Sequence, residues 1–170
     1  MIDKWSKVGK CGQEGFGALK LKSRFRSRSE HTLDSKGRLS FPSRFRDVLR
    51  NFESEILMVT PWGKHLRAFP VAEWEQLEEK LLTKGKEQEG MASFVRLIVS
   101  GVNECSLDKQ GRLLLPQPLR NEVNLQKEVV LTGMLDWVEI WDKDAWVKEH
   151  EATQANFDTF EDKLSKLGIF

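Results

Sequence analysis

The sequence of 170 residues predicts an α+β fold built from two similar halves in tandem. Three observations predict it: a ten-residue motif occurs twice, alternating apolar residues flank each copy, and a short amphipathic segment follows each copy. The motif is Leu33-Asp-Ser-Lys-Gly-Arg-Leu-Ser-Phe-Pro42 in the first half and Leu107-Asp-Lys-Gln-Gly-Arg-Leu-Leu-Leu-Pro116 in the second, 74 residues later. An Arg follows each Pro at the same distance, as Arg46 and Arg120.

Each copy of the motif predicts a strand, a tight turn, a strand and a short helix. Asp34 can accept a hydrogen bond from a backbone N–H two residues on, and Gly37 tolerates a positive φ. A type I turn followed by a left-handed glycine is a common hairpin connection. Pro42 ends the second strand and suits the first turn of a helix over residues 43–52. The second motif predicts the same hairpin around its own Asp and Gly.

The later segments of the two halves also follow one another in the same order. In the first half the pattern predicts strands over 55–60 and 65–69, a helix from 70 to about 85, and a helical segment over 91–101. In the second half it predicts a helix over 118–123, strands over 128–132 and 137–141, and a helix from 142 to 150. Glu55 aligns with Glu128 and Trp74 with Trp146, and we expect both Trp residues to anchor the core or a subunit interface.

These elements predict five regions along the chain. They are a flexible basic extension (1–24), a first repeat (25–75), connecting helices (76–101), a second repeat (102–150) and a polar C-terminal tail (151–170), helical near residues 159–167.

Charge is distributed unevenly between the two ends of the chain. The net charge is +1, yet residues 1–50 hold 13 Lys or Arg against 5 Asp or Glu, and the remaining 120 hold 14 against 21. A basic N-terminal third is typical of nucleic-acid binding. The two cysteines have no metal-ligand spacing, and no apolar run is long enough to span a membrane. We therefore expect a cytoplasmic protein.

Arg38 and Arg112 each follow a turn glycine, at the tip of a predicted hairpin, with Lys36 and Lys109 beside them. One interpretation is a local ion pair, Asp34 with Arg38, that only stiffens the turn. The other is a rigid arginine aimed at an anionic partner. The residues alone leave both open.

Catalysis is not predicted. Asp34 and Asp108 could be proposed as an acid/base pair, but turn geometry already explains both, and the Arg four residues on keeps each ionised. No histidine, cysteine or serine constellation, glycine-rich phosphate loop or metal motif accompanies them. We expect no cofactor, metal or small-molecule substrate.

At these residues the chain resembles the MraZ family of bacterial regulators, over roughly residues 25–150. The resemblance rests on the segment Glu30 to Arg46, on Phe94-Val-Arg-Leu97 and on the second motif. It implies two AbrB-like (SpoVT-AbrB) halves whose hairpins interlock into a pseudo-two-fold, swapped-hairpin β-barrel with flanking helices. It also implies a ring-shaped homo-oligomer that binds tandem promoter repeats of the division and cell-wall gene cluster, and a location at the nucleoid.

Carried onto this chain, the family motif falls on Asp34 and Arg38 in the first half and on Asp108 and Arg112 in the second. A hairpin tip can enter a major groove, where Arg pairs bidentately with guanine. The four cations Lys36, Arg44, Arg46 and Lys109 would contact phosphates. Because the first half is the more basic, we expect it to carry more of the contact. The alternative function is an oligomeric scaffold or protein-interaction module without base readout.

Overall fold

A computed structural model describes residues 24–85 and 87–169. The predicted basic extension thus lies outside the described residues, apart from Arg24.

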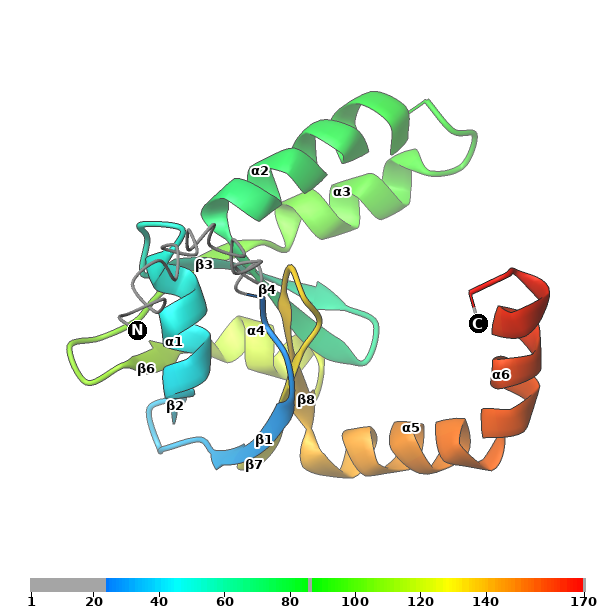
Figure 1. The fold of residues 1–170 in the computed structure, drawn as a ribbon. Helices are drawn as coiled ribbons and strands as arrows, with labels where there is room; N and C mark the ends of the chain where they lie inside the picture. The colour runs from blue at the N-terminus through cyan, green and yellow to red at the C-terminus, as the bar shows by residue number, and fades with distance from the viewer. Residues whose placement is uncertain (1–23, 86, 170) are drawn as a thin grey trace, which may run out of the picture.

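The described chain contains eight strands and six α-helices, in the order that the two-half interpretation predicts (Figure 1). The first half holds β1 (Arg28–Thr32), β2 (Arg38–Ser40), α1 (Ser43–Arg50), β3 (Ile56–Trp62), β4 (His65–Pro70), α2 (Val71–Lys80), a π-helical turn η1 (Leu81–Gly85) and α3 (Ala92–Ser100). The second holds β5 (Asn103–Ser106), β6 (Arg112–Leu114), α4 (Gln117–Glu122), β7 (Glu128–Gly133), β8 (Val138–Asp142), α5 (Lys143–Ala155) and α6 (Phe157–Lys166).

The strands form two antiparallel sheets, and both sheets mix the two halves. The larger sheet has the order β1-β7-β8-β4-β3-β5, and the smaller sheet pairs β2 with β6. The first strand of each half therefore pairs with the other half: β1 joins β7 and β5 joins β3. The predicted exchange of hairpin strands between halves is observed.

The predicted closed barrel is not observed in the described residues, and the predicted hairpins need a correction. β1 and β5 are the two edges of an open sheet, so no ladder closes it. Within each motif the flanking strands barely pair with one another. In the first motif the contact is the turn itself, where the N–H of Asp34 donates to the carbonyl of Arg38 at 2.9 Å. Since β1 and β2 pair with different partner strands, the chain crosses from one sheet to the other at the turn.

A pseudo-two-fold axis relates the halves and passes between the two central strands. β4 pairs with β8 so that Arg67 faces Glu139, its own equivalent 72 residues later. Thr32 of β1 pairs with Glu128, and its equivalent Ser106 of β5 pairs with Ile56. Ile56, not Glu55, is therefore the equivalent of Glu128. The expected alignment of Glu55 with Glu128 is thus wrong by one residue. The offset between the halves falls from 74 to 72 before β7 begins, and not to 73 there as that alignment required.

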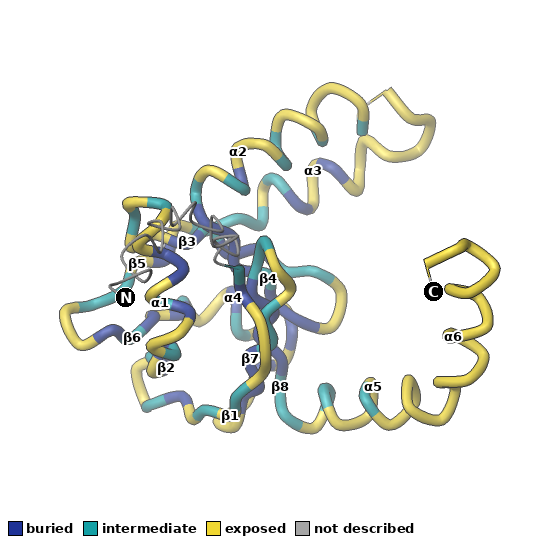
Figure 2. Tube along the Cα trace, in the orientation of Figure 1, coloured by how far each residue is buried: buried dark blue, intermediate teal, exposed yellow. Residues whose placement is uncertain are grey.

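The main core lies where the two sheets and the helices α1 and α4 meet (Figure 2). Leu39 and Leu113, which face each other across the small sheet, are 1% and 0% exposed. Phe41 and Phe45 pack beside them with ring centroids 5.7 Å apart. The apolar face of the small sheet is therefore anchored, which leaves its other face to solvent.

A second apolar cluster joins α2 and α3 to strands β3 and β4 of the large sheet. It centres on Phe69, Trp74 and Ile98. Trp74 is buried as expected, whereas its equivalent Trp146 on α5 is only half-buried, beneath Arg28, whose guanidinium lies 4.4 Å from the indole centroid. No helix within the described residues is long and apolar enough to cross a membrane.

Candidate nucleic-acid interface

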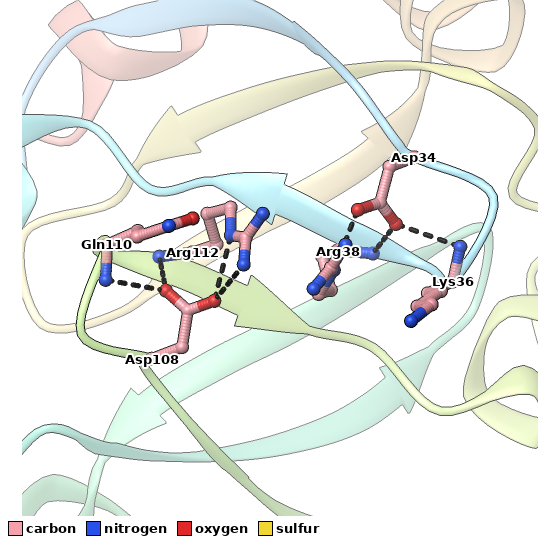
Figure 3. A network of polar contacts seen from close by, with 6 residues as sticks. All are labelled: Asp34, Lys36, Arg38, Asp108, Gln110 and Arg112. Atoms are coloured by element: carbon pink, nitrogen blue, oxygen red, sulfur yellow. Dashed lines mark hydrogen bonds and ion pairs between the residues drawn. The ribbon is translucent and has the colours of Figure 1, made fainter.

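Arg38 and Arg112 lie on one face of a single ribbon, the β2-β6 pair. In this ladder Arg38 is opposite Leu114 and Arg112 is opposite Ser40. Residues opposite each other in an antiparallel pair share a face, so both arginines project from the face that turns away from the core. Diagonal neighbours of this kind have Cα atoms about 7–8 Å apart. The two motifs of the sequence therefore form one joint site (Figure 3).

Each arginine is held by the aspartate of its own turn (Figure 3). One Asp34 carboxylate oxygen accepts hydrogen bonds from the backbone N–H groups of Lys36 and Arg38, both at 2.9 Å, and the other accepts from Arg38 Nε at 2.7 Å. Asp108 makes the same three contacts, to the N–H groups of Gln110 and Arg112 at 2.9 Å and to Arg112 Nε at 2.8 Å. The predicted local ion pairs are both present, and Arg112 Nη2 also lies 2.7 Å from Asp108 Oδ2. Within the described residues, these contacts leave Nη1 of Arg112 and the terminal nitrogens of Arg38 available to a partner.

The pKa values of both aspartates are lowered. The backbone N–H of Arg38 is the largest cause that lowers the pKa of Asp34, to about 2, and the Arg38 side chain adds to it. The Arg112 side chain lowers the pKa of Asp108 first, and its backbone N–H second. Both carboxylates stay charged at any physiological pH, so the clamp on each arginine does not depend on protonation.

The turns themselves have the predicted chemistry. Gly37 N–H donates to the carbonyl of Asp34 at 3.0 Å, and Gly111 does the same to Asp108 at 2.8 Å. Both glycines have the expected left-handed backbone, with φ of +80° and +72°. These residues fold as turns because Asp caps the open N–H groups and glycine takes the φ that other residues avoid.

The arginine after each proline supports the turn of the other half. The Arg120 guanidinium lies against Gly37, where an added Cβ would come within 2.8 Å of its Cζ, and Arg120 Nε donates to the carbonyl of Leu115 at 3.0 Å. Arg46 lies against Gly111 in the same way. Arg46 and Arg120 thus couple the two turns, a role that the sequence analysis did not assign to either, although their equal spacing after Pro42 and Pro116 was the signal.

The remaining predicted cations surround the ribbon unevenly. Lys36 and Lys109 are exposed on the two turns. Arg44 is exposed on α1 and donates to the carbonyl of Arg28 at 2.8 Å. Arg46 is half-buried, and its Nε is a buried atom without a hydrogen-bond partner among the described residues. The structure therefore brings Arg38, Arg112 and the two lysines to one ribbon and places Arg46 behind it.

A buried polar cluster at the pseudo-two-fold axis was not predicted. Glu139 accepts a hydrogen bond from Trp141 Nε1 at 3.0 Å and lies 3.4 Å from His65 Nε2. Arg67 stacks between two indole rings, 4.2 Å from Trp62 and 5.0 Å from Trp137. This cluster lies on the large sheet and is not part of the ribbon. No group of three or more metal-ligating side chains occurs in the described residues.

Comparison with known proteins gives the same family for both halves. The chain matches the family described as "MraZ protein, putative antitoxin-like" twice, over residues 25–95 and 98–167. A protein named Transcriptional regulator MraZ from Syntrophobacter fumaroxidans is 43% identical over 122 residues, 72% of this chain and 81% of its own. Proteins of the same name from Pediococcus pentosaceus and Desulforapulum autotrophicum are 39% and 38% identical, each over 85% of this chain and 99% of their own.

The fold and the site define a two-repeat α+β protein whose halves jointly build an arginine-bearing ribbon. Ribbons of this kind are one of the surfaces that transcriptional regulators insert into DNA grooves. The chain belongs to the MraZ family of transcriptional regulators.

Proposed function

We propose that the chain is a sequence-specific DNA-binding regulator that reads DNA with Arg38 and Arg112 together. The observation that carries the proposal is their common face on the β2-β6 ribbon, each held by an ionised aspartate. A two-stranded ribbon fits a major groove, and an arginine there pairs bidentately with guanine O6 and N7. Asp34 holds Nε of Arg38, and Asp108 holds both Nε and Nη2 of Arg112. The hydrogens on the remaining terminal nitrogens would contact the base.

The other cations position the ribbon. Lys36, Lys109 and Arg44 are exposed and would contact phosphates on either side of the groove. Arg46 supports the Gly111 turn from behind, and a phosphate contact of its own would come only from its terminal nitrogens. Since both halves contribute to one ribbon, we propose that the second arginine takes part as fully as the first, despite the more acidic second half.

The target follows from the family resemblance. The relatives carry the name transcriptional regulator, and the resemblance implies tandem promoter repeats of the division and cell-wall gene cluster, bound at the nucleoid. A ring-shaped homo-oligomer would present several ribbons at fixed spacing. Avidity on repeated boxes then raises affinity without any new contact.

The competing function is an oligomeric scaffold in which the two arginines serve protein contacts. A gel shift with DNA from upstream of the chain's own gene separates the two. We expect Arg38→Ala to abolish the specific shift while the oligomer stays intact, and affinity to fall steeply with salt because phosphate contacts release counterions.

The matched control is Arg96→Ala. Arg96 is an exposed arginine of the same half, on α3, and it belongs to neither turn motif. An unchanged shift with Arg38→Ala, or an equal loss with Arg96→Ala, would refute base readout by the ribbon. A response to salt that is flat would favour the scaffold.

A further inference from the structure

The C-terminal helix α6 carries an apolar stripe that nothing in the described chain covers. Phe157, Phe160, Leu164 and Leu167 recur at i, i+3, i+7 and i+10 and are 60%, 43%, 37% and 74% exposed. This spacing places them on one helix face. Figure 2 shows the whole of α6 as exposed, at the end of α5. A solvated monomer would not be expected to keep such a face open.

The first half shows how its own helices are covered. There α3 packs back on the sheet and on α2: Ile98 and Trp74 are each 2% exposed, and Thr60 Oγ1 donates to the carbonyl of Ile98 at 3.1 Å. In the second half α5, the equivalent of α2, has no buried residue. The pseudo-symmetry of the fold is therefore broken at the C-terminal helices, where α5 is only partly covered and α6 has no cover within the described chain.

A groove of about 610 Å³ lies on a different surface of the same chain, between α3, α4 and the β3-β4 turn. Its walls are mainly apolar and include Trp62, Phe94, Leu97 and Leu119. Phe94 and Leu97 are 40% and 64% exposed, and the Phe94 ring meets Trp62 edge-on at 5.9 Å. Both halves contribute to this groove, because α4 belongs to the second.

We propose that α6 of one copy docks into the α3-α4 groove of a second copy. The occupant is an amphipathic helix with anchors at i, i+3 and i+7, the pattern that apolar grooves accept. The stripe spans about 15 Å at 1.5 Å per residue.

A second copy is favoured over the chain's own groove because of where α5 carries α6. At 13 residues α5 is about 20 Å long and projects from the sheet, so that α6 stands apart from the body (Figure 1). The stripe and the groove are different patches, so their contact is heterologous, and repeated heterologous contacts form a ring when the rotation between copies closes. The inference rests on the ring of the proposed function and names its interface.

Sedimentation velocity of the full chain tests the interface with three exposed substitutions. Leu164→Asp in the stripe and Leu97→Asp in the groove should each reduce the wild-type oligomer to monomers. Ser165→Asp adds the same charge to the polar side of α6, and it should leave the oligomer intact. Because all three positions are exposed, circular dichroism should show an unchanged fold.

Co-expressing a Phe160→Cys chain with a Leu97→Cys chain then separates exchange between copies from closure within one. A disulfide between the two chains is expected, and a disulfide formed only inside a chain that carries both changes would overturn the proposal. If both Asp variants keep the wild-type size, this interface is wrong while the ring stands. A monomeric wild type at tens of micromolar would instead remove the ring itself.

Discussion

Replacing Gly37 with alanine tests the coupling of the two turns. An added Cβ would lie 2.8 Å from the Arg120 guanidinium and 2.8 Å from the carbonyl oxygen of Leu115. The arginine can swing away, but the carbonyl belongs to backbone that follows β6. The left-handed φ adds a cost of its own. The substitution therefore combines backbone strain with a clash that cannot relax cheaply.

Two other glycines separate these costs. Gly63 has φ of +67° with no atom within 4 Å of an added Cβ, so Gly63→Ala should cost only the left-handed strain, about 1–2 kcal/mol. At Gly111 the three atoms nearest to an added Cβ belong to the flexible Arg46 side chain, so Gly111→Ala should cost slightly more than Gly63→Ala. Overpacking adds about 1–3 kcal/mol, so Gly37→Ala should cost about 2–5 kcal/mol.

Urea unfolding at one protein concentration measures all three, since oligomerisation makes stability concentration-dependent. The Arg46→Ala background should lower the cost of Gly111→Ala toward that of Gly63→Ala, because the three atoms nearest to an added Cβ at Gly111 all belong to Arg46. Equal losses at Gly37 and Gly63 would refute the coupling, since strain alone would then account for both.

Two further predictions concern titratable groups. Burial raises the pKa of Glu139, but hydrogen bonds from His65 and Trp141 outweigh it and lower the pKa to about 2. A carboxyl group with a lowered pKa stabilises the fold at pH values above its ordinary pKa, and this stabilisation disappears as the pH falls toward 2. Glu139→Gln should therefore lower the free energy of unfolding by at most about 3 kcal/mol at pH 7, and by progressively less below pH 4.5. A loss of stability that is independent of pH would contradict the ion pair. Burial raises the pKa of the Cys105 thiol to about 11, so in a Cys11→Ala background a disulfide reagent at pH 8 should label Cys105 only after unfolding, and fast labelling of the native protein would contradict its burial.

The order of strands and helices could be predicted because its signals are local. Asp34, Gly37 and Pro42 impose a turn, a left-handed residue and a helix start, whatever the rest of the chain does. The pairing of the strands could not be predicted in this way. The same turn chemistry serves whether β2 pairs with β1 or with β6, and only the burial of Leu39 against Leu113 decides it. Strand exchange depends on residues about 74 positions apart, which no local pattern contains.

The residues of the candidate site also fall into those that local spacing predicts and those that depend on strand pairing. Asp34 and Arg38 are four residues apart across one turn, so their ion pair followed from spacing. That Arg38 and Arg112 share one face required the pairing of β2 with β6. The stripe of α6 was present in the spacing of Phe157, Phe160 and Leu164, but the polar residues around it led to the interpretation of a polar tail.

Duplication inside one chain explains why the paired arginines are a property of the monomer. Two separate chains that exchanged strands would form the ribbon only after dimerisation, at a cost set by concentration. Here the connection through α2 and α3 makes the pairing of β2 with β6 intramolecular, so each chain carries a complete two-arginine ribbon. Association through α6 and the α3-α4 groove then leaves the ribbon free, because neither surface includes Arg38 or Arg112. DNA binding and assembly can therefore be separated by mutation. Leu164→Asp should weaken binding to tandem boxes, because avidity is lost, while a single box is still bound. Arg38→Ala should abolish binding to tandem boxes and to a single box alike.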